Sequence, residues 1–576
     1  MDNRKNTPDG SLPEGLSAWL HPDKKKKKIL LIAGISFAAV VLLTVLIAVI
    51  ASAGCRTETP PDPSSAESAP ASPAESRSED PEESESGPSE AQEPQSSSEP
   101  AAESEAETEI VFPDKPSEGL AYEDAGNGTL RLVGRGTNED DVIVVPSEVD
   151  GKKVLSIAPG VFSGGRYSSE GDRKLIGLKL SEGFETVDGF AFQNLFALRE
   201  LRLPSTLKTI GDNAFCDARE LRSLTLPEGL TSIGEYAFAF CKKINDLRIP
   251  DNVTALGRYS FQYCESLTSV RVGTGVTDLR EGVFLQDASL KSVSLPEGMT
   301  RLRSEALGEC VSLEELHLPS TVTEIQSNVV SGCAALRKLD IAEGGSRYVS
   351  GPDCIIDPAK KTLVLGCAST VIPEDGSVTA IGEAAFFNVP GLTEIVIPDA
   401  VVSIGAGAFE DSRKLKKVTL GSGVRSIEGS AFWGCWGLEE ISDLPEGITV
   451  IKSGTFGNCL KLKSVSLPDS VERIENQAFY NCGELQTVRF GSGLKTIGSS
   501  AFWTCPNLTS FSLPSGLTRI SDSAFMYDKS IGTIRFDGTA EQWDAVSKDS
   551  NAFYHTDRIT VVCTDGERIY NDPFSD

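Results

Sequence analysis

The sequence predicts a β-rich repeat solenoid with coils of roughly 23 residues, preceded by a single transmembrane helix and a disordered acidic linker. Three observations carry this prediction: a motif that recurs at a fixed spacing after residue 118, an uncharged apolar run at residues 29–53, and a stretch rich in Pro, Ser and Glu between them. Apolar residues make up 39% of the chain, which is low for a packed globular protein and high for a disordered one. We therefore expect segments of unlike composition with separate roles.

The repeat is clearest in residues 201–215 and 224–238, which read LRLPSTLKTIGDNAF and LTLPEGLTSIGEYAF. A phenylalanine closes each motif, and it recurs at Phe192, Phe215, Phe238, Phe261, Phe284, Phe386, Phe409, Phe432, Phe456, Phe479, Phe502 and Phe525, with Leu307 and Val330 in its place in two coils. A fixed period of this length is typical of solenoids, in which each coil buries its apolar side only against its neighbours.

Each part of the motif has a local interpretation. The Leu-x-Leu alternation predicts a short strand, and the proline after it ends strand pairing because it has no N–H. The glycine that follows the isoleucine column, as at Gly211 and Gly234, predicts a turn in which φ is positive. The Ala-Phe pair then places a ring in the core that successive coils share.

Two irregularities interrupt the period. Val330 and Phe386 are separated by 56 residues, which predicts an irregular insertion near residues 342–378 that divides the solenoid into two arms. Ser442 and Asp443 lengthen one period by a residue, which predicts a bulge. We place the solenoid and its N-terminal cap at 118–535 and a C-terminal cap at 536–576, because terminal coils need atypical ends to shield their apolar faces.

The repeats resemble the BspA-like leucine-rich repeats of bacterial cell surfaces, whose pattern is L-x-x-L-x-L-P-x-x-L-x-x-I-G-x-x-A-F-x-x-C. The resemblance covers residues 118–576, with residues 144–151 similar to the opening coil and residues 536–543 similar to the closing element. It implies a leucine-rich repeat fold and, as in some members of the family, surface adhesion or binding of host proteins. It does not identify a ligand.

The N-terminal segments predict a membrane anchor. Residues 1–28 form a short cytoplasmic tail that ends in the run Lys24–Lys28, and residues 29–53 are long enough to cross a hydrocarbon core of ~30 Å. The lysines before the span predict a single-pass protein at the cell membrane, with its N-terminus in the cytoplasm and the repeats outside. The tetrapeptide Ser52-Ala53-Gly54-Cys55 also resembles a lipobox, in which Cys55 would be lipidated. An uncleaved signal anchor and a lipoprotein signal therefore both remain open.

Residues 54–117 predict a disordered stalk. Between residues 56 and 110, 16 acidic residues and 2 arginines give a charge of −14 out of the −29 of the whole chain, with 9 Pro, 13 Ser and no aromatic residue. Such a segment cannot bury enough apolar surface to offset its conformational entropy. The acidic balance of the chain also argues against a nucleic-acid partner, because little is available to neutralise phosphates.

Neither catalysis nor metal binding is expected. The three histidines, His21, His317 and His555, lack metal-ligand spacing, and no G-x-S-x-G, HExxH, CxxC or phosphate-loop motif occurs. We predict no catalytic residues, no metal and no cofactor. Eight cysteines lie three places after the ladder position, at Cys241, Cys264, Cys310, Cys333, Cys435, Cys459, Cys482 and Cys505. Disulfides between coils are conceivable, but recurrence with the structural period favours a column of buried thiols. Cys216 breaks this phase, and we expect it to be more exposed.

Two sets of residues are candidates for partner binding. Arg202, Arg248 and Arg271 occupy outward strand positions and form a basic stripe on an acidic protein, which would steer an acidic partner; the alternative is an ordinary solvated sheet face. The second set is aromatic, and its members are either contact anchors or packing between coils: Phe240, Tyr263, Trp433, Tyr480 and Trp503.

Two functions follow from this organisation. The first is a membrane-anchored surface protein that presents an extended face for protein binding or adhesion, with a host surface protein, a matrix protein or a cell-wall polymer as its partner. The second is an envelope-organising structural protein that self-associates or binds wall polymer without a host ligand. Neither is an enzyme.

Overall fold

The computed structural model describes residues 110–162, 171–345 and 347–570, all within one compact unit, Thr108–Asp576. The expected cytoplasmic tail, the apolar span at 29–53, Cys55 and the acidic stretch up to residue 109 lie outside the described residues. Among the residues that the structure does describe, none belongs to a helix with the length and apolar character needed to span a bilayer.

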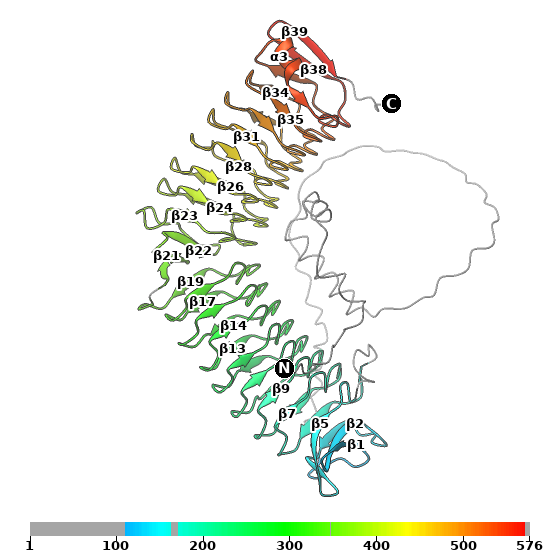
Figure 1. Ribbon diagram of the computed structural model, residues 1–576. Helices are drawn as coiled ribbons and strands as arrows, with labels where there is room; N and C mark the ends of the chain where they lie inside the picture. Colours follow the sequence, from blue (N-terminus) through cyan, green and yellow to red (C-terminus); the bar gives the residue numbers. More distant parts are fainter. Residues whose placement is uncertain (1–109, 163–170, 346, 571–576) are drawn as a thin grey trace, which may run out of the picture. The chain divides into compact units, whose positions relative to one another are not determined.

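The described chain is a β-solenoid, as the sequence predicted (Figure 1). A typical coil contributes two short strands, and each strand pairs in parallel with its counterpart about one period away, as in Leu247 with Val270 and Ser232 with Ala255. The strands therefore build two faces. The Leu-x-Leu segments form face 1, whose strands are β3(Val142–Val145), β6(Gly177–Leu180), β8(Glu200–Arg202), β11(Asp246–Arg248), β13(Ser269–Arg271), β15(Ser292–Ser294), β17(Glu315–Leu318), β19(Lys338–Ile341), β24(Glu394–Ile397), β26(Lys417–Leu420), β28(Glu440–Ile441), β30(Ser464–Ser466), β32(Thr487–Arg489), β34(Ser510–Leu513), β36(Thr533–Phe536) and β38(Ile559–Cys563).

Face 2 is built from the two-residue strands that precede the glycine turn. Its strands are β7(Thr186–Val187), β9(Thr209–Ile210), β10(Ser232–Ile233), β12(Ala255–Leu256), β14(Asp278–Leu279), β16(Arg301–Leu302), β18(Glu324–Ile325), β23(Ala380–Ile381), β25(Ser403–Ile404), β27(Ser426–Ile427), β29(Val450–Ile451), β31(Arg473–Ile474), β33(Thr496–Ile497), β35(Arg519–Ile520) and β37(Ser547–Lys548). Because side chains alternate along a strand, each face buries one row and exposes the next.

Both ends of the solenoid are closed by atypical elements. At the start, β1(Ala121–Gly126), β2(Thr129–Gly134), β5(Lys152–Ile157) and β4(Glu148–Val149) form a sheet in that order. At the end, β39(Gly566–Tyr570) pairs antiparallel with β38, and α3(Ala540–Ala545) follows a capping box made by Thr539 and Gln542. Trp543 is fully buried there and its indole N–H donates to the Tyr570 hydroxyl at 2.7 Å. These elements cover the apolar faces of the terminal coils.

The ordered unit begins before residue 118. The described end of the expected linker lies against the first coils, because Phe112 is 9% exposed and the Ser117 backbone N–H donates to the Val144 carbonyl at 2.9 Å. A linker boundary at residue 117 is therefore too late. Phe112 was the signal in the sequence for this earlier boundary, because the acidic segment before it has no aromatic residue.

The insertion is an antiparallel ribbon of β20(Val349–Gly351), β21(Cys354–Asp357) and β22(Thr362–Gly366), and β22 then pairs in parallel with β23. The apolar core divides at this ribbon. Ile355 belongs to the core of the first arm, whereas its neighbours Cys354 and Ile356 belong to the core of the second arm. The neighbouring strand β22 is divided in the same way, with Leu365 in the core of the first arm and Leu363 in that of the second, so the ribbon closes both cores.

The phenylalanine column is a stack of rings inside the solenoid. Consecutive ladder rings lie 4.9 to 6.0 Å apart between centroids and are nearly parallel, as in Phe215 and Phe238 at 5.2 Å and 8°. The ladder phenylalanines, from Phe192 to Phe525, are fully buried. Each ring fills the space between its neighbours, so the coils cannot be separated without exposing both faces of a ring.

The glycine after the isoleucine column does not adopt the positive φ that the sequence predicted. Positive φ instead recurs two residues later, at Asn213 (55°) and Tyr236 (56°), and again two residues after the ladder ring, as at Tyr263 (59°). The glycine is needed for space: a Cβ on Gly211 would lie 2.6 Å from the Gly189 backbone nitrogen, and one on Gly257 would overlap the Gly234 and Glu235 backbone. The prediction of a special position was correct, but its physical reason was wrong.

The cysteines form a column of free, buried thiols, as the period favoured. The eight cysteines that recur with the period each donate from Sγ to a carbonyl of the preceding coil, for example Cys310 to the Phe284 oxygen at 3.1 Å. Burial raises the pKa of thiols such as Cys264 and Cys459 well above its usual range. Cys216 is also buried at 8% exposure, so the expectation of greater exposure was wrong. This column is structural.

Three polar residues replace cysteine in this column. Ser412 uses its hydroxyl in both directions, accepting from the Val389 N–H at 3.1 Å and donating to the Phe386 carbonyl at 2.8 Å. Asp287 and Asp528 each accept from one backbone N–H, at 2.7 and 2.5 Å, but their other carboxyl oxygens are buried without a hydrogen-bond partner. Burial raises the pKa of both carboxyls well above its usual range.

We expect the double variant Asp287→Ser with Asp528→Ser to be more stable than the wild type, by about 1–3 kcal/mol per site near pH 7, because serine can make both bonds that Ser412 makes. Below about pH 4 the carboxyls are protonated in both the folded and the unfolded state, so their ionisation costs no folding stability. As pH rises from there towards the folded-state pKa, the unfolded state ionises and the folded state does not, so the wild type loses stability. The gain in midpoint temperature, measured by circular dichroism, should therefore grow from pH 4 upwards. A gain that stays constant with pH would contradict the assignment.

Gly257→Ala should cost roughly 1–3 kcal/mol of stability, because the added methyl must displace the backbone of the coil below it. Gly532→Ala is the matched control, since a Cβ at Gly532 meets nothing within 4 Å and should change stability by less than about 0.5 kcal/mol. Thermal unfolding of both variants measures the difference, and equal effects would argue against tight contact between coils at the glycine column.

Candidate functional site

Face 1 of the first arm is hollowed where it crosses β11, β13 and β15. The hollow has a volume of about 560 Å³. Its floor is the strand backbone at Leu247, Val270 and Val293, whose side chains point the other way and are buried in the core. It exists because short serines stand on β13 and β15 where longer side chains occupy the neighbouring coils; the outward residues that line it are Asp246, Arg248, Ser269, Arg271, Ser292 and Ser294.

Two of the three predicted arginines meet at this hollow. Arg248 and Arg271 are directly paired across β11 and β13, and their side chains are 47% and 48% exposed. Arg202 lies outside it, because the coil containing Thr225 intervenes. Arg202 pairs with Glu200 at 2.7 Å and its guanidinium carbon lies 4.3 Å from the centre of the Phe112 ring. The structure thus brings together Arg248 and Arg271 and assigns Arg202 to the edge where residue 112 packs.

Carboxylates hold both arginines at the hollow. Arg248 forms ion pairs with Glu228 and, at 3.9 Å, with Asp251, while Arg271 reaches Asp251 at 3.5 Å. The pKa of Asp251 is lowered, first by the hydrogen bond from the Thr274 backbone N–H and then by the two arginines. The sequence predicted a basic stripe, but it did not reveal these loop carboxylates. The surface of this hollow therefore carries both positive and negative side chains, and ion pairs hold them in place.

The same row continues to His317 on β17. The His317 ring contacts Asp340 through Nδ1 at 2.7 Å and Glu315 through Nε2 at 3.2 Å. These two partners, Asp340 first, raise the pKa of His317 above its usual value of 6.5. The side chain is 53% exposed, so the histidine belongs to the solvated face.

The aromatic candidates of the first arm are stacked between coils. The Phe240 and Tyr263 rings lie 4.8 Å apart at 11°, next to the Tyr236 and Tyr259 pair at 5.0 Å and 13°. All four are half-buried. Because stacked rings cover each other's faces, they offer a partner chiefly their edges.

The second arm carries a longer aromatic series. Trp433 lies 6.1 Å from Tyr480 because Gly457 leaves its space to the indole, and Tyr480 meets Trp503 edge to face at 5.2 Å. The series continues through Tyr527, 6.3 Å from Trp503, to His555 at 4.8 Å. Tyr527 was not predicted from the sequence. It follows the ladder ring Phe525 by two places, which is the spacing of Phe240 and Tyr263 from their own ladder rings.

Trp436 is the most exposed tryptophan surface in this region and was also missed. It is 43% exposed, and the Arg413 guanidinium carbon lies 4.1 Å from its ring centre. Tyr527 is similarly exposed at 40%. Trp436 lies outside the ladder column, so the repeat pattern gave no reason to select it.

The described residues offer no group of His, Cys, Asp and Glu side chains arranged to hold a metal ion. Thiols whose pKa is raised by burial, such as Cys435 and Cys459, are poor nucleophiles. What face 1 does offer is a shallow surface with arginines held in ion pairs beside short serines, and this arrangement suits binding.

Comparison with known proteins identifies the repeats. The family model described as BspA type Leucine rich repeat region matches residues 165–287, 280–349, 366–461 and 440–560. A leucine-rich repeat protein from Bacteroides ovatus ATCC 8483 is 26% identical with a TM-score of 0.50, over 73% of this chain and 99% of that one. A leucine rich cell surface protein from Faecalibacterium prausnitzii A2-165 is 23% identical with a TM-score of 0.44, over 77% and 99% of the two chains. Comparison with curated proteins gives no match.

Asp340→Asn should lower the pKa of His317 towards its ordinary value, because the neutral amide no longer favours the imidazolium. Glu315→Gln should lower it less, since Glu315 is the weaker of the two partners. An NMR titration of the His317 ring signals measures both shifts, with Asp251→Asn, on the same face, as the variant that leaves them unchanged. Equal shifts in all three variants would contradict the pairing.

Proposed function

The chain belongs to the BspA-type leucine-rich repeat family, and from that premise we propose that it is a bacterial surface protein whose solenoid binds another protein through face 1 of its first arm. The observation that carries the proposal is the hollow at β11, β13 and β15, where Arg248 and Arg271 stand beside the short side chains of three serines. Leucine-rich repeat solenoids generally serve as binding scaffolds, because stacking creates extended surfaces. The proposed role is non-catalytic.

The chemistry of the hollow supports a protein ligand. Arginines held at fixed positions lose less conformational freedom on binding than free ones, and arginine is enriched among residues that dominate interfaces. The short side chains of Ser269, Ser292 and Ser294 leave room beside the arginines for a side chain from the partner. We infer a ligand segment with a carboxylate that engages Arg248 and Arg271.

The N-terminal sequence supports display at the membrane. The lysines before residue 29, the apolar run at 29–53 and the acidic stalk that follows would hold the solenoid outside the cell. Cys55 offers lipidation as the other means of attachment. On either route the proposed ligand is external, a host surface or matrix protein.

A second candidate is the envelope-organising role, in which copies of the chain associate. The observation that favours it is β39, which ends its sheet and exposes Ile569 by 51%, since such an edge strand can pair with another chain. Static light scattering of the purified full-length protein separates the two roles, because self-association requires no ligand.

The variant Arg248→Ser with Arg271→Ser tests the binding proposal. We expect it to weaken binding of the full-length protein to its ligand, found by surface plasmon resonance against host matrix proteins, at least tenfold, or about 1.4 kcal/mol. Serine already occupies this row at Ser294, so the sheet should fold unchanged.

The matched control is Arg489→Ser with Arg535→Ser, which removes two exposed arginines from the same row in the second arm. It should leave affinity within twofold. The proposal fails if no matrix protein shows saturable binding, or if the control loses as much affinity as the test variant.

A further inference from the structure

Face 2 of the first arm carries a second hollow, away from the strands used by the proposed protein ligand. It has a volume of about 420 Å³ and lies over β14, β16 and the turns that follow them. Its lining residues are Arg258, Asp278, Arg280, Glu281, Arg301, Arg303 and Gln326. Four arginines and two carboxylates line the hollow, and two further carboxylates, Glu235 and Glu324, pair with its arginines, so positive and negative side chains are equal in number here.

The repeat pattern changes at this hollow. Three preceding coils place a glycine after the isoleucine column, at Gly211, Gly234 and Gly257, where the backbone of the coil below leaves no room for a Cβ. The next three coils have Arg280, Arg303 and Gln326 at that position. The second arm also replaces this glycine in three successive coils, at Glu428, Lys452 and Glu475, so what distinguishes the first arm is that two of its replacements are arginines in adjacent coils.

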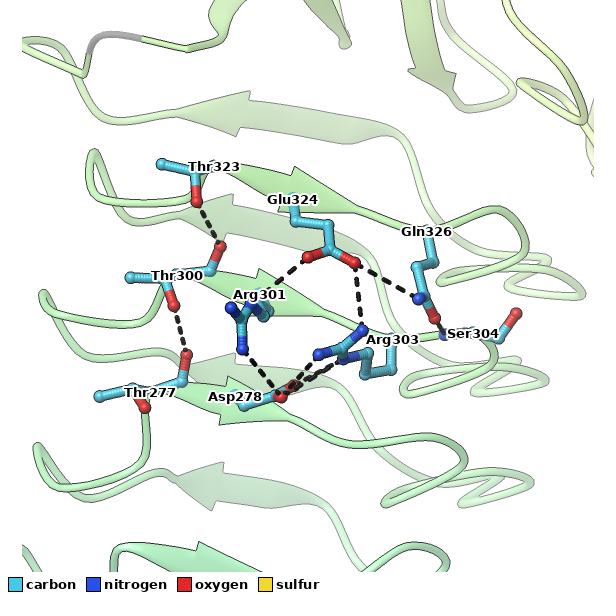
Figure 2. A network of polar contacts seen from close by, with 9 residues as sticks. All are labelled: Thr277, Asp278, Thr300, Arg301, Arg303, Ser304, Thr323, Glu324 and Gln326. Carbon is cyan, nitrogen blue, oxygen red and sulfur yellow. Dashed lines mark hydrogen bonds and ion pairs between the residues drawn. The ribbon is translucent and has the colours of Figure 1, made fainter.

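A network of ion pairs fixes two of the arginines (Figure 2). Arg303 donates to both Asp278 oxygens, from Nε at 3.0 Å to Oδ1 and from Nη2 at 3.0 Å to Oδ2, and from Nη1 to Glu324 at 3.1 Å. Arg301 lies 3.3 Å from Glu324 and 3.9 Å from Asp278. Figure 2 shows the two guanidinium groups between these carboxylates, which come from the coils on either side. The carboxylates hold the forks in place without using every N–H.

The carboxylate at the other side of the hollow is already engaged. Glu281 accepts from the Tyr259 hydroxyl at 2.8 Å and lies 3.5 Å from Arg258. Arg280 is exposed, and within the described part of the chain it has no ion pair and no hydrogen bond from its guanidinium. The hollow therefore combines fixed arginines with one free cation.

We propose that this hollow binds a tetrahedral oxyanion, the phosphate or sulfate group of an extended anionic ligand. Guanidinium forks match the geometry of such groups and bind them through paired N–H donors. Arg280 supplies the free donors, and Arg303 and Arg301, already positioned, supply the rest. The chain as a whole is acidic, so it does not attract anions from a distance. Salt screens the attraction by the arginines beyond about a Debye length, ~8 Å at physiological salt, so only a ligand seated in the hollow gains from it.

The test is isothermal titration calorimetry of the full-length protein with sodium tripolyphosphate and, separately, with a heparin oligosaccharide. We expect saturable binding of at least one probe, and which probe binds assigns phosphate or sulfate. Arg280→Gly should weaken that binding at least tenfold. Glycine is the residue of this column in the preceding coils, so the variant restores the repeat and should retain its unfolding temperature. Arg280→Lys keeps the charge without the fork and should fall between the two.

Lys452→Gly is the matched control. Lys452 occupies the same column in the second arm, and its replacement by glycine removes the same positive charge. It should change affinity less than twofold. The proposal is overturned if neither probe binds the wild type, if Arg280→Gly binds as well as the wild type, or if both glycine variants weaken binding equally. Failure here leaves the proposed protein ligand of face 1 untouched, because its variants lie on other strands.

Discussion

Each coil of this protein can bury its apolar side only against the coil before it and the coil after it, and the rest of the structure depends on this constraint. The stacked phenylalanines occupy the shared interior at 4.9 to 6.0 Å spacing. Close backbone approach requires glycine at positions such as Gly257. The thiol column satisfies carbonyl groups that the turns leave inside, as Cys310 does for Phe284. Because inward positions are fixed in this way, recognition can vary only at outward ones.

The insertion shows how the same constraint is met where the period fails. A missing coil surface would leave an apolar layer exposed on each side of the gap. The ribbon β20–β22 avoids this because β21 directs Ile355 towards one core and Cys354 and Ile356 towards the other. The two arms are therefore joined by β21 and β22, which both contribute side chains to the two cores, and the apolar residues of β21 follow from its burial on both faces.

The sequence predicted the features that repeat and missed those that depend on contacts across coils. The period, the phenylalanine column and the buried thiols follow from spacing alone. The carboxylates around Arg248 could not be foreseen, because Glu228 and Asp251 come from loops whose approach to the strand depends on side-chain geometry. The glycine column was identified, but its cause was assigned to φ instead of to the backbone below. Arg280 and Arg303 stand where other coils have this glycine. Had the column been explained by lack of space, these two arginines would have pointed to the hollow on face 2 from the sequence alone.

The two hollows differ in how their charges are arranged, and this difference determines what each can select. At face 1, the paired arginines share Asp251, so little field extends beyond the surface and a ligand must make contact to gain energy. At face 2, Arg280 adds an unpaired charge to a fixed pair of forks, so a compact anion gains both charge and geometry. Long-range attraction is weak at both, because the arginines at each hollow stand among carboxylates that pair with them. Discrimination between ligands at either hollow therefore rests on fit within a few ångströms, which a stack of rigid coils is suited to provide.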